Sequence, residues 1–329
     1  MSANFPNVTI LIPTLNEEDY IEQCIYSILN NNSEIVESIE ILVIDGGSVD
    51  KTQEKVLKLS ERYLQLRLLD NPKKIVPAAL NIGVANSSYD TLIWLGAHAI
   101  YDADYIVKSV ETLQKTGAAV VGGVLSAKGK GPFGKSLAFA TSTKFGIGNA
   151  KYRYATKIQS VDTVFGGCWT KETVLKAGGF NEQWVRNQDF EFNQRVRDTV
   201  GEIILNPSIR VEYFVRESPK QLARQYFQYG FWRYKTFQKH PSSLGMRQLI
   251  PFSLVLLLII SVLISPFNIT LAIIAPICYL SVVVVISAFE VIRKWKIKYF
   301  LRLLIIYPIL HISWGLGFFW SIIKSRLSF

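Results

Sequence analysis

Acidic side chains follow two apolar segments near the start of the chain, where a carboxylate is well placed to hold a ligand. Glu17 comes shortly after the run Val8–Ile12, and Asp45 and Asp50 follow the run Ile39–Ile44. A carboxylate can accept hydrogen bonds from an imide N–H or from ribose hydroxyls. Each acid also has an ordinary explanation, because acids favour helix starts and Asp-Gly-Gly favours a turn.

A further acid, Asp189, stands at the expected start of a later helix, in the stretch Asn187–Glu191. A carboxylate there can act as a general base, an effect of roughly 10²–10⁴-fold on a reaction rate. The alternative is that Asp189 is the N-cap residue of the helix and Glu191 lies in its first turn. Both can hold, because a capping position also keeps a carboxylate in place.

The elements that must position these residues read as alternating strands and helices. The two apolar runs flank an amphipathic helix over about 17–29, which predicts a β-α-β unit with ligands at the carboxyl ends of its strands. The first strand does not run into G-x-G-x-x-G, so the dinucleotide fingerprint is absent. Further strands are predicted over 66–69, 91–95, 118–122, 202–205 and 210–214. One more strand is predicted to end at Phe165.

Two short motifs then carry a resemblance. P-T-L-N-E at 13–17 and D-G-G-S-V-D-K-T at 45–52 resemble the nucleotide-binding half of family-2 glycosyltransferases. The resemblance implies an α/β, Rossmann-like GT-A domain that binds a nucleotide sugar, with a UDP-sugar as the expected donor. By the same resemblance Pro13, Glu17 and Asp45 contact the donor and Asp50 supports their loop. Asp189 matches the catalytic base of the family, although Gln188 replaces the usual glutamate.

A longer run, N-P-K-K-I-V-P-A-A-L-N-I-G at 71–83, is similar to a subgroup, the bacterial exopolysaccharide glycosyltransferases of the succinoglycan-biosynthesis type. It adds Lys73 and Asn81 to the expected donor-binding residues. Lys73 and Lys74 either attract a diphosphate or belong to a solvated loop.

The expected metal motif departs from the family pattern. Most members have D-x-D after the fourth strand and the subgroup has D-A-H, where this chain has Gly96-Ala97-His98. Mg²⁺ or Mn²⁺ is the expected cofactor, since both accept oxygen ligands and Mn²⁺ also accepts imidazole. With Gly96 in place of the acid, His98 is either a ligand or a structural histidine. Asp102 and Asp104 are predicted to cap the next helix instead of binding metal.

The acceptor side is expected to combine several segments. Glycines and Pro132 over 129–134 predict a mobile lid. Gly166 and Gly167 let an acceptor sugar approach the backbone, or else form a β-bulge. A helix over 219–240 interleaves aromatic and basic residues, which favours a membrane-interface helix over nucleic-acid binding because apolar spans follow it. Its residues Gln225, Trp232 and Arg233 are candidate acceptor contacts or interfacial anchors.

Composition points to a membrane. The net charge is +10 and the mean hydropathy is +0.22. A chain that is both basic and apolar is typical of a protein that associates with an anionic membrane surface. Apolar spans are predicted over 249–265, 269–289 and 303–323, and basic residues over 293–302 predict that this loop and the catalytic domain are cytoplasmic. Pro308, His311 and Gly315 interrupt the third span, which either crosses the membrane or forms a re-entrant segment. The cysteines indicate neither a disulfide framework nor a zinc site, and no signal peptide is expected.

These observations predict a GT-A domain over 1–215, an amphipathic interfacial helix over 216–245 and a membrane anchor over 246–329. The predicted protein is a multi-pass enzyme of the plasma membrane. It is expected to transfer a sugar from a nucleotide sugar to a lipid-linked saccharide, in contact with membrane lipids and not nucleic acid. The resemblance implies that the product belongs to exopolysaccharide or surface-glycan synthesis. Two alternatives stay open: a glycosyltransferase acting on polyprenyl phosphate itself, and a degenerate, non-catalytic membrane subunit.

Overall fold

The computed structural model describes residues 6–29, 36–148 and 150–327. Two compact units share the chain. The first comprises Met1–Ser126 and Lys151–Tyr213, and the second comprises Ala127–Ala150 and Phe214–Phe329. Each unit is therefore built from two separate segments of sequence.

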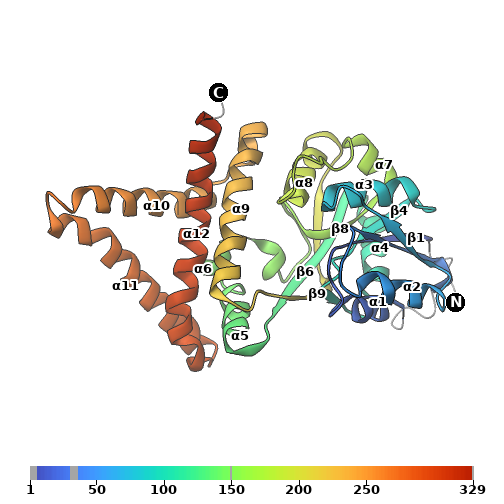
Figure 1. The fold of residues 1–329 in the computed structure, drawn as a ribbon, viewed down its shortest axis with the longest axis horizontal. Coiled ribbons are helices and arrows are strands. Elements are labelled where there is room, and N and C mark those ends of the chain that lie inside the picture. Colours follow the sequence, from blue (N-terminus) through green and yellow to red (C-terminus); the bar gives the residue numbers. More distant parts are fainter. Residues whose placement is uncertain (1–5, 30–35, 149, 328–329) are drawn as a thin grey trace. The chain divides into compact units, whose positions relative to one another are not determined.

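The first unit is organised around a mixed sheet, which has nine strands among the described residues (Figure 1). Their order is β3-β2-β1-β4-β8-β6-β9-β5, and β7 pairs with β9. β1 runs parallel to β2 and β4, and β2 runs parallel to β3, whereas β8 is antiparallel to β4 and β6. The strands are β1 (Val8–Thr14), β2 (Ile39–Asp45), β3 (Leu66–Asp70), β4 (Thr91–Trp94), β5 (Ala99–Tyr101), β6 (Val120–Lys128), β7 (Gln159–Ser160), β8 (Phe165–Thr170) and β9 (Ile203–Phe214).

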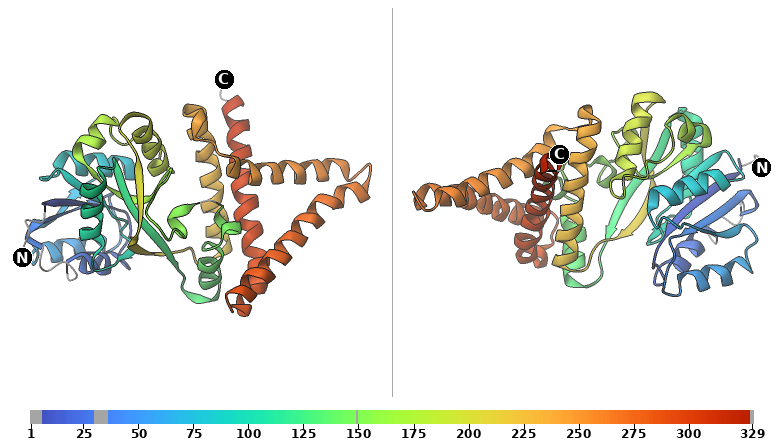
Figure 2. Two further views of the ribbon diagram at one scale, coloured as in Figure 1. Left: turned by 180° about the vertical axis from the view of Figure 1, so that it is seen from behind. Right: turned by 45° about the horizontal axis from the view of Figure 1, so that its top comes forward.

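Alternate residues of the strands feed two separate cores, because successive side chains of a strand point to opposite faces. Ile10 and Ile12 pack with helices α1 (Ile21–Leu29), α2 (Thr52–Ser60) and α4 (Tyr105–Thr116). Leu11 packs on the other face with helices α3 (Val76–Asn86), α7 (Lys171–Lys176) and α8 (Gln188–Thr199). The result is a three-layer α/β arrangement, visible from several sides in Figure 2.

The α/β prediction is confirmed, with local differences. The strand expected to end at Phe165 begins there, and the two strands expected over 202–214 are one strand, β9. Asn206-Pro207-Ser208 reads as a turn, but the side chain of Asn206 accepts from the backbone N–H of Ser208 at 3.0 Å and donates to Thr112 at 2.8 Å. These bonds satisfy a polar segment inside the strand. The short strand β5 carries too little sequence signal to be predicted.

Six α-helices make up the described part of the second unit. They are α5 (Gly131–Ala140), α6 (Lys144–Ile147), α9 (Pro219–Lys239), α10 (Met246–Ile264), α11 (Ile269–Arg293) and α12 (Phe300–Leu327). The lid expected over 129–134 is wrong, because Gly131 and Pro132 begin helix α5, which packs against α12. Proline fits the first turn of a helix, where its missing N–H removes no bond. Residues 127–150 thus belong to the same compact unit as the C-terminal helices. The expected domain boundary at residue 215 assigns them to the first domain.

Helices α9 and α12 lie side by side with their backbones in close contact (Figure 2). A Cβ on Gly230 would lie 1.9 Å from the carbonyl oxygen of Trp314, and one on Gly317 would lie 1.9 Å from that of Phe227. Glycine is therefore required on both helices. The helix predicted over 219–240 is confirmed, and it packs along α12 over much of its length.

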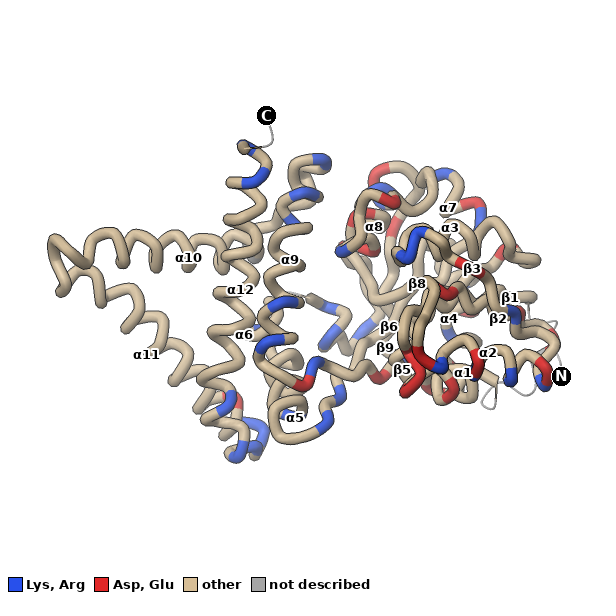
Figure 3. The backbone as a smooth tube through the Cα atoms, in the orientation of Figure 1, with Lys and Arg blue, Asp and Glu red and all other residues tan. Residues whose placement is uncertain are grey.

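Two segments of the described residues are long and apolar enough to cross a bilayer: α11, Ile269–Arg293, and Ile297–Leu327, which joins α12 to the short 3-10 turn before it. Helix α10 has a shorter apolar stretch, Gln248–Ile264. The predicted turn at 266–268 is confirmed, and Asn268 caps α11 by accepting from the N–H of Leu271 at 3.0 Å. Lys and Arg residues gather at the turn between α11 and α12, whereas the α10–α11 hairpin carries few charged residues (Figure 3).

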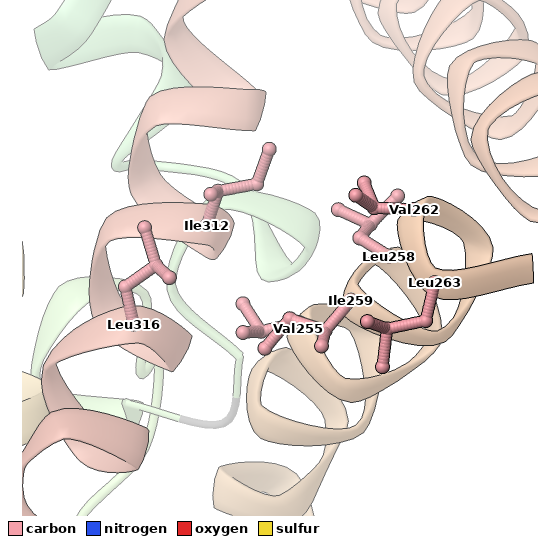
Figure 4. A pocket seen from close by; sticks show the side chains of 7 residues that line it. All are labelled: Val255, Leu258, Ile259, Val262, Leu263, Ile312 and Leu316. Carbon is pink, nitrogen blue, oxygen red and sulfur yellow. The ribbon is translucent and has the colours of Figure 1, made fainter. Parts of the chain in front are cut away.

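Helix α12 continues without a break through Pro308, His311 and Gly315, so the expected interruption is not seen. The imidazole of His311 bonds to the hydroxyl of Tyr279 at 3.0 Å and to the carbonyl of Phe145 at 2.8 Å. Gly315 leaves room for the carbonyl of Pro251 on α10. Where α10 and α12 diverge, an open pocket is lined only by aliphatic side chains: Val255, Leu258, Ile259, Val262, Leu263, Ile312 and Leu316 (Figure 4).

Candidate functional site

Two loops at the carboxyl ends of β1 and β2 are cross-linked by reciprocal hydrogen bonds. The side chain of Asn16 accepts from the N–H of Val49 at 2.9 Å, and the N–H of Asn16 donates to Ser48 Oγ at 2.8 Å. Asn16 has a left-handed backbone, with φ 55°, and helix α1 begins only at Ile21. Asn16 thus links the two loops and does not cap the helix. Pro13 precedes this loop inside β1, opposite Ile44.

Asp50 supports the same junction. Its carboxylate accepts from the N–H of Glu18 at 3.1 Å and from both the N–H and the hydroxyl of Thr52, and these bonds lower the pKa of Asp50 although its partial desolvation raises it. Thr52 in turn accepts from the N–H of Glu17 at 2.8 Å. A charged acceptor that receives several N–H and O–H bonds holds both loops in one conformation.

Asp45 is buried at the end of β2, with 1% of its surface exposed. Its carboxylate accepts from the N–H groups of Gly47 and Ser48 at 2.9 and 2.8 Å, and from the side chains of Ser48 and Gln53. Three of these bonds go to Oδ1 and one goes to Oδ2. Asp45 therefore orders the loop over 46–53.

Glu17 and His98 come together where the strand order reverses. The chain winds outward from β1 to β2 and β3 and then returns to place β4 on the other side of β1. Glu17 follows β1 and His98 follows β4, and the Nδ1–H of His98 donates to Glu17 Oε1 at 3.0 Å. Ligands of open α/β sheets bind at such a switch point. Both side chains are partly exposed, at 31% for His98 and 21% for Glu17.

The backbone of Gly96, two residues before His98, is held by hydrogen bonds with Tyr101 and Cys24. Its N–H donates to the Tyr101 hydroxyl at 2.6 Å, and its carbonyl accepts from Tyr101 at 3.2 Å and from the Cys24 thiol at 3.7 Å. Burial, and to a lesser degree the charge of Glu17, raises the pKa of Cys24 to about 12, so the sulfur keeps its proton. The segment that carries His98 is thereby fixed.

Among the described residues, no group of three or more His, Cys, Asp or Glu side chains is arranged to hold a metal ion. What they do offer to a divalent cation is the neighbouring carboxylate and imidazole of Glu17 and His98. Such a pair fits a cation of the Mg²⁺ or Mn²⁺ type that takes most of its ligands from substrate phosphates and water. Asp104 occupies the N-cap position of α4, but its carboxylate makes no capping hydrogen bond and pairs with Lys108 instead, so the predicted side-chain cap is not seen.

Lys73 and Asn81 contact the loop between α7 and α8. Lys73 forms an ion pair with Glu182, and the Asn81 amide donates to Glu182 at 3.2 Å and exchanges two further bonds with the backbone of Phe180. Lys74 has a left-handed backbone, with φ 56°, and its ammonium would lie 3.4 Å from a Cβ on Gly47. Of the two lysines, Lys74 is therefore the one whose side chain lies over the loop after β2.

Gly166 and Gly167 begin β8 beside the end of β4. A Cβ on Gly166 would lie 2.5 Å from the Trp94 carbonyl, and both glycines have positive φ. The ring of Phe165 lies 3.6 Å from a Cβ built on Gly96, so this turn adjoins the His98 segment. The backbone pairing of β6 with β8 is irregular here, as expected for a bulge.

Asp189 lies in the first turn of α8, whose N-cap residue is Asn187, so Asp189 is not the N-cap. The same helix carries Glu191, which is fully buried and receives two bonds from Arg195, at 3.0 and 2.8 Å. Arg195 also donates to the carbonyl of Ala177. Helix α8 is thus tied to the end of α7.

The remaining expected acceptor residues, Gln225, Trp232 and Arg233, lie on α9 in the second unit. Arg233 is buried, and its guanidinium donates to the carbonyl of Ser243 at 2.8 Å. Gln225 donates to the Tyr229 hydroxyl at 3.0 Å, and Lys235 lies 4.4 Å from the centre of the Trp232 ring. Arg233 therefore stabilises the turn after α9.

Sequence reasoning missed Glu182 and the cross-linking role of Asn16. Glu182 follows Gly178-Gly179-Phe180-Asn181, a polar turn that gives no sign of its partners on α3. Asn16 offered one signal, because asparagine tolerates the left-handed conformation better than most residues.

Comparison with known proteins agrees with this geometry. The family model described as glycosyl transferase family 2 matches residues 9–179. The succinoglycan biosynthesis protein ExoA of Rhizobium meliloti is 32% identical over 246 residues, which are 74% of each chain. A dolichyl N-acetyl-alpha-D-glucosaminyl phosphate 3-beta-D-2,3-diacetamido-2,3-dideoxy-beta-D-glucuronosyltransferase of Methanococcus voltae is 27% identical over 98% of this chain and 99% of its own.

Among solved structures, the mannosyltransferase PcManGT of Pyrobaculum calidifontis, in complex with GDP-Man and Mn²⁺, is similar with a TM-score of 0.67. The likeness covers 97% of this chain and 88% of that one at 16% identity, and it confirms the expected GT-A fold. The family match, the fold and the paired strand-end loops agree, and the chain belongs to the family-2 glycosyltransferases.

Proposed function

We propose that this glycosyltransferase moves a sugar from a UDP-sugar to a lipid-linked saccharide in the synthesis of an exopolysaccharide or another surface glycan. The printed names of two relatives support the proposal. One acts in succinoglycan biosynthesis, and the other is named for a dolichyl-phosphate-linked saccharide and matches nearly the full length of the chain.

One observation carries the donor side: Glu17 and His98 meet at the switch point between β1 and β4. The loops beside them are held in place by Asn16, Asp45 and Asp50 before any ligand arrives. A preorganised polar site binds with little loss of conformational freedom. We assign the donor nucleotide to this edge of the sheet, with Lys73 and Lys74 beside it.

The proposed chemistry is an inverting transfer. Asp189 takes the proton from the acceptor hydroxyl as that oxygen attacks the anomeric carbon, and the nucleoside diphosphate leaves. The leaving group needs positive charge and no proton, and a divalent cation beside Glu17 and His98 would supply that charge when bound. We assign the acceptor to the side of Gly166 and Gly167, whose Cβ positions are taken up by the Trp94 carbonyl and the Trp169 ring.

A membrane location suits a lipid-linked acceptor, which is delivered in the plane of the bilayer. Helices α11 and α12 have the length and apolar composition to cross it, and the basic turn between them favours the cytoplasmic face. We propose an anchor within 246–329 preceded by α9, with a multi-pass arrangement in the plasma membrane. The aliphatic pocket between α10 and α12 offers only apolar surface, as expected where hydrocarbon surrounds a protein.

The first test measures binding and transfer separately. Calorimetry in detergent would titrate the full-length protein with UDP and with GDP, each with and without Mn²⁺. Transfer would be followed from radiolabelled nucleotide sugars to a membrane lipid extract. Asp189→Asn should lose about 10²-fold or more of the transfer rate while keeping UDP affinity, because a general base is removed and the donor pocket is intact. Asp198→Asn, the same change near the other end of α8, should leave transfer unchanged.

Gly96→Asp extends the test to the metal. The position accepts a side chain, since a Cβ there meets only Phe165 at 3.6 Å and Tyr101 at 3.9 Å. The variant should gain a stronger dependence of UDP binding on Mn²⁺. Binding of GDP and not UDP would show that the donor is a GDP-sugar and not the proposed UDP-sugar. Failure to bind either nucleotide would favour the non-catalytic subunit.

A further inference from the structure

Asn81 connects two parts of the first unit that lie far apart in sequence. It stands on α3 and faces the loop between α7 and α8, where its amide oxygen accepts from the N–H of Phe180 at 2.8 Å and its amide nitrogen donates to the Phe180 carbonyl at 2.9 Å. The same nitrogen donates to Glu182 at 3.2 Å. An amide paired in both directions with one residue's backbone holds that residue in position as well as in orientation.

The loop is shaped to receive this amide. Gly178 and Gly179 have φ values of 79° and 71°, and a Cβ on Gly179 would lie 3.2 Å from the Asn81 amide oxygen. Glycine adopts this backbone without strain and also keeps the approach open. The close contact between α3 and the loop is therefore built into both segments.

Phe180 passes the contact on to α8. It is buried and stacks on Phe192 with ring centres 4.2 Å apart and planes inclined by 22°. Both rings also pack against the fully buried Trp169 of β8, at 5.9 and 5.7 Å. Interiors this closely packed transmit displacement, because a side chain cannot move without its neighbours. Phe192 stands one turn after Asp189 on the same helix.

The other end of α3 is fixed against the donor-side loop. The turn before α3 is held by a bond from the N–H of Asn71 to the Asp45 carbonyl at 2.7 Å, and a Cβ on Gly46 would lie 3.3 Å from Lys74 Cα. Helix α3 thus has one end at the proposed nucleotide loop and carries Asn81 toward the helix of the proposed base.

We propose that Asn81 is a positioning residue for catalysis, which sets the placement of α8 and its Asp189 through Phe180 and Phe192, and that it does not itself bind the donor. The proposal rests on the proposed function in one respect, the catalytic role of Asp189. A small displacement of a catalytic group lowers the rate of the chemical step and leaves ligand binding elsewhere intact.

The test uses Asn81→Asp in the full-length protein. This change keeps the acceptor for the Phe180 N–H, removes both donated bonds and brings a second carboxylate beside Glu182. Asn86→Asp is the matched control, since Asn86 lies exposed on the same helix and donates only to the Ile82 carbonyl, at 2.9 Å. Three quantities are compared: amide hydrogen exchange over 178–193, affinity for UDP (or GDP, whichever the wild type binds), and the transfer rate.

We expect Asn81→Asp to speed exchange both in the loop and in the first turns of α8, and to lower the transfer rate by roughly 10- to 100-fold. Nucleotide affinity should stay within about twofold of the wild type, since the side-chain bonds of Asn81 go to Phe180 and Glu182 and not to the loops after β1 and β2. Adding Glu182→Gln should restore part of the rate, because the new amide can donate to the introduced carboxylate. Phe192→Leu should speed exchange in α8 while the Asn81–Phe180 bonds persist.

Two results would overturn the inference. Loss of nucleotide affinity with unchanged exchange in α8 would make Asn81 a donor ligand. Faster exchange confined to 178–182 with a full transfer rate would limit Asn81 to local loop structure. Failure of the proposed function gives a different result, because Asp189→Asn would then retain transfer activity. The hydrogen-exchange rates would still show whether Asn81 stabilises α8.

Discussion

At the scale of single residues, Glu40 shows how a buried carboxylate stabilises the sheet at the edge opposite the candidate site. Only 7% of its surface is exposed. It accepts from the Thr9 hydroxyl at 2.7 Å and from the N–H and hydroxyl of Ser88 at 2.8 and 2.7 Å, and it pairs with Arg67 at 3.1 Å. Desolvation raises the pKa of Glu40, but these bonds and the Arg67 charge outweigh it and hold the pKa below its usual value of 4.5.

Glu40→Gln should therefore lower the free energy of unfolding by about 1–3 kcal/mol at pH 7, because buried partners lose their charged acceptor. A depressed native pKa stabilises the fold fully above the unfolded-state value, and this contribution is lost as the pH falls through the native pKa. The difference between variant and wild type should shrink under acid, as followed by denaturant titration in detergent at several pH values. Glu172→Gln removes only an exposed ion pair with Lys176 and should change stability little at any pH. Equal losses for both variants would contradict this account.

The residue scale also separates polar groups that organise a site from those that meet its ligand. Asp45, Asp50 and Asn16 have their side-chain oxygens engaged by backbone N–H groups of neighbouring loops. Glu17 and His98 keep part of their surface exposed and contact each other. We expect substitutions in the first group to disturb the loops, and substitutions in the second to act on bound ligand directly.

At the scale of elements, the contact between α9 and α12 depends on the absence of side chains. Gly230 and Gly317 each face a carbonyl of the opposite helix, with no space for a methyl group. Small residues let apolar helices approach closely, and dispersion contacts then hold them together. The aromatic residues of α9 read as a membrane-interface pattern, but Tyr234 packs on Phe318 of α12 at 5.2 Å.

Gly230→Ala should separate the two helices and lower the stability of the second unit by about 1–3 kcal/mol, since the backbone atoms it meets cannot rotate away. Thermal unfolding of the purified protein in detergent would measure the loss. Gln238→Ala, at an exposed position of the same helix, should have no such effect and controls for helix propensity. A melting temperature for Gly230→Ala equal to that of the wild type would show that the helices are not packed this closely.

Packing between segments far apart in the sequence also decided where some helices and strands begin and end. Glycine and proline over 129–134 predicted a loop, yet Pro132 sits in the first turn of α5, and the helix packs on α12. The two strands predicted over 202–205 and 210–214 are one strand, β9, which contains the segment between them. In each case packing against a distant segment outweighed a local preference of a few tenths of a kcal/mol to about 1 kcal/mol per residue.

At the scale of the whole molecule, the proposed membrane arrangement gives a defined sidedness. Helices α11 and α12 span 25 and 28 residues and meet at the basic turn over 293–302. The turn at 266–268 before α11 has no charge and exposes Phe267. If α11 crosses the bilayer, these two turns lie on opposite sides.

Cysteine labelling in intact cells would test this sidedness. In a Cys278→Ser background, Phe267→Cys should react with a membrane-impermeant maleimide from outside, and Lys296→Cys should react only after the cells are opened. The native Cys24 and Cys168 are buried and should stay silent. Leu64→Cys, at an exposed site of the first unit, serves as the cytoplasmic reference. Reaction of positions 267 and 296 from the same side would show that α11 does not cross.

The sequence by itself determined the strand–helix alternation and the apolar C-terminal helices. These follow from periodicity and composition, which are local properties that a run of residues carries wherever it lies. The GT-A class was implied by the resemblance of the motifs at 13–17 and 45–52 to family-2 glycosyltransferases. The sequence also marked Glu17, Asp45, Asp50 and Asp189, because their motifs stand directly after strands or at the start of a helix.

Only the tertiary structure decided which of these residues face each other. The pairing of Glu17 with His98, of Asn81 with Phe180, and of α5 with α12 joins segments far apart in the chain. No local preference encodes such a contact, since it exists only after the sheet register and the helix packing are established. For the same reason Asp45 could be placed in the site from its motif, while its four loop bonds could be seen only in the folded chain.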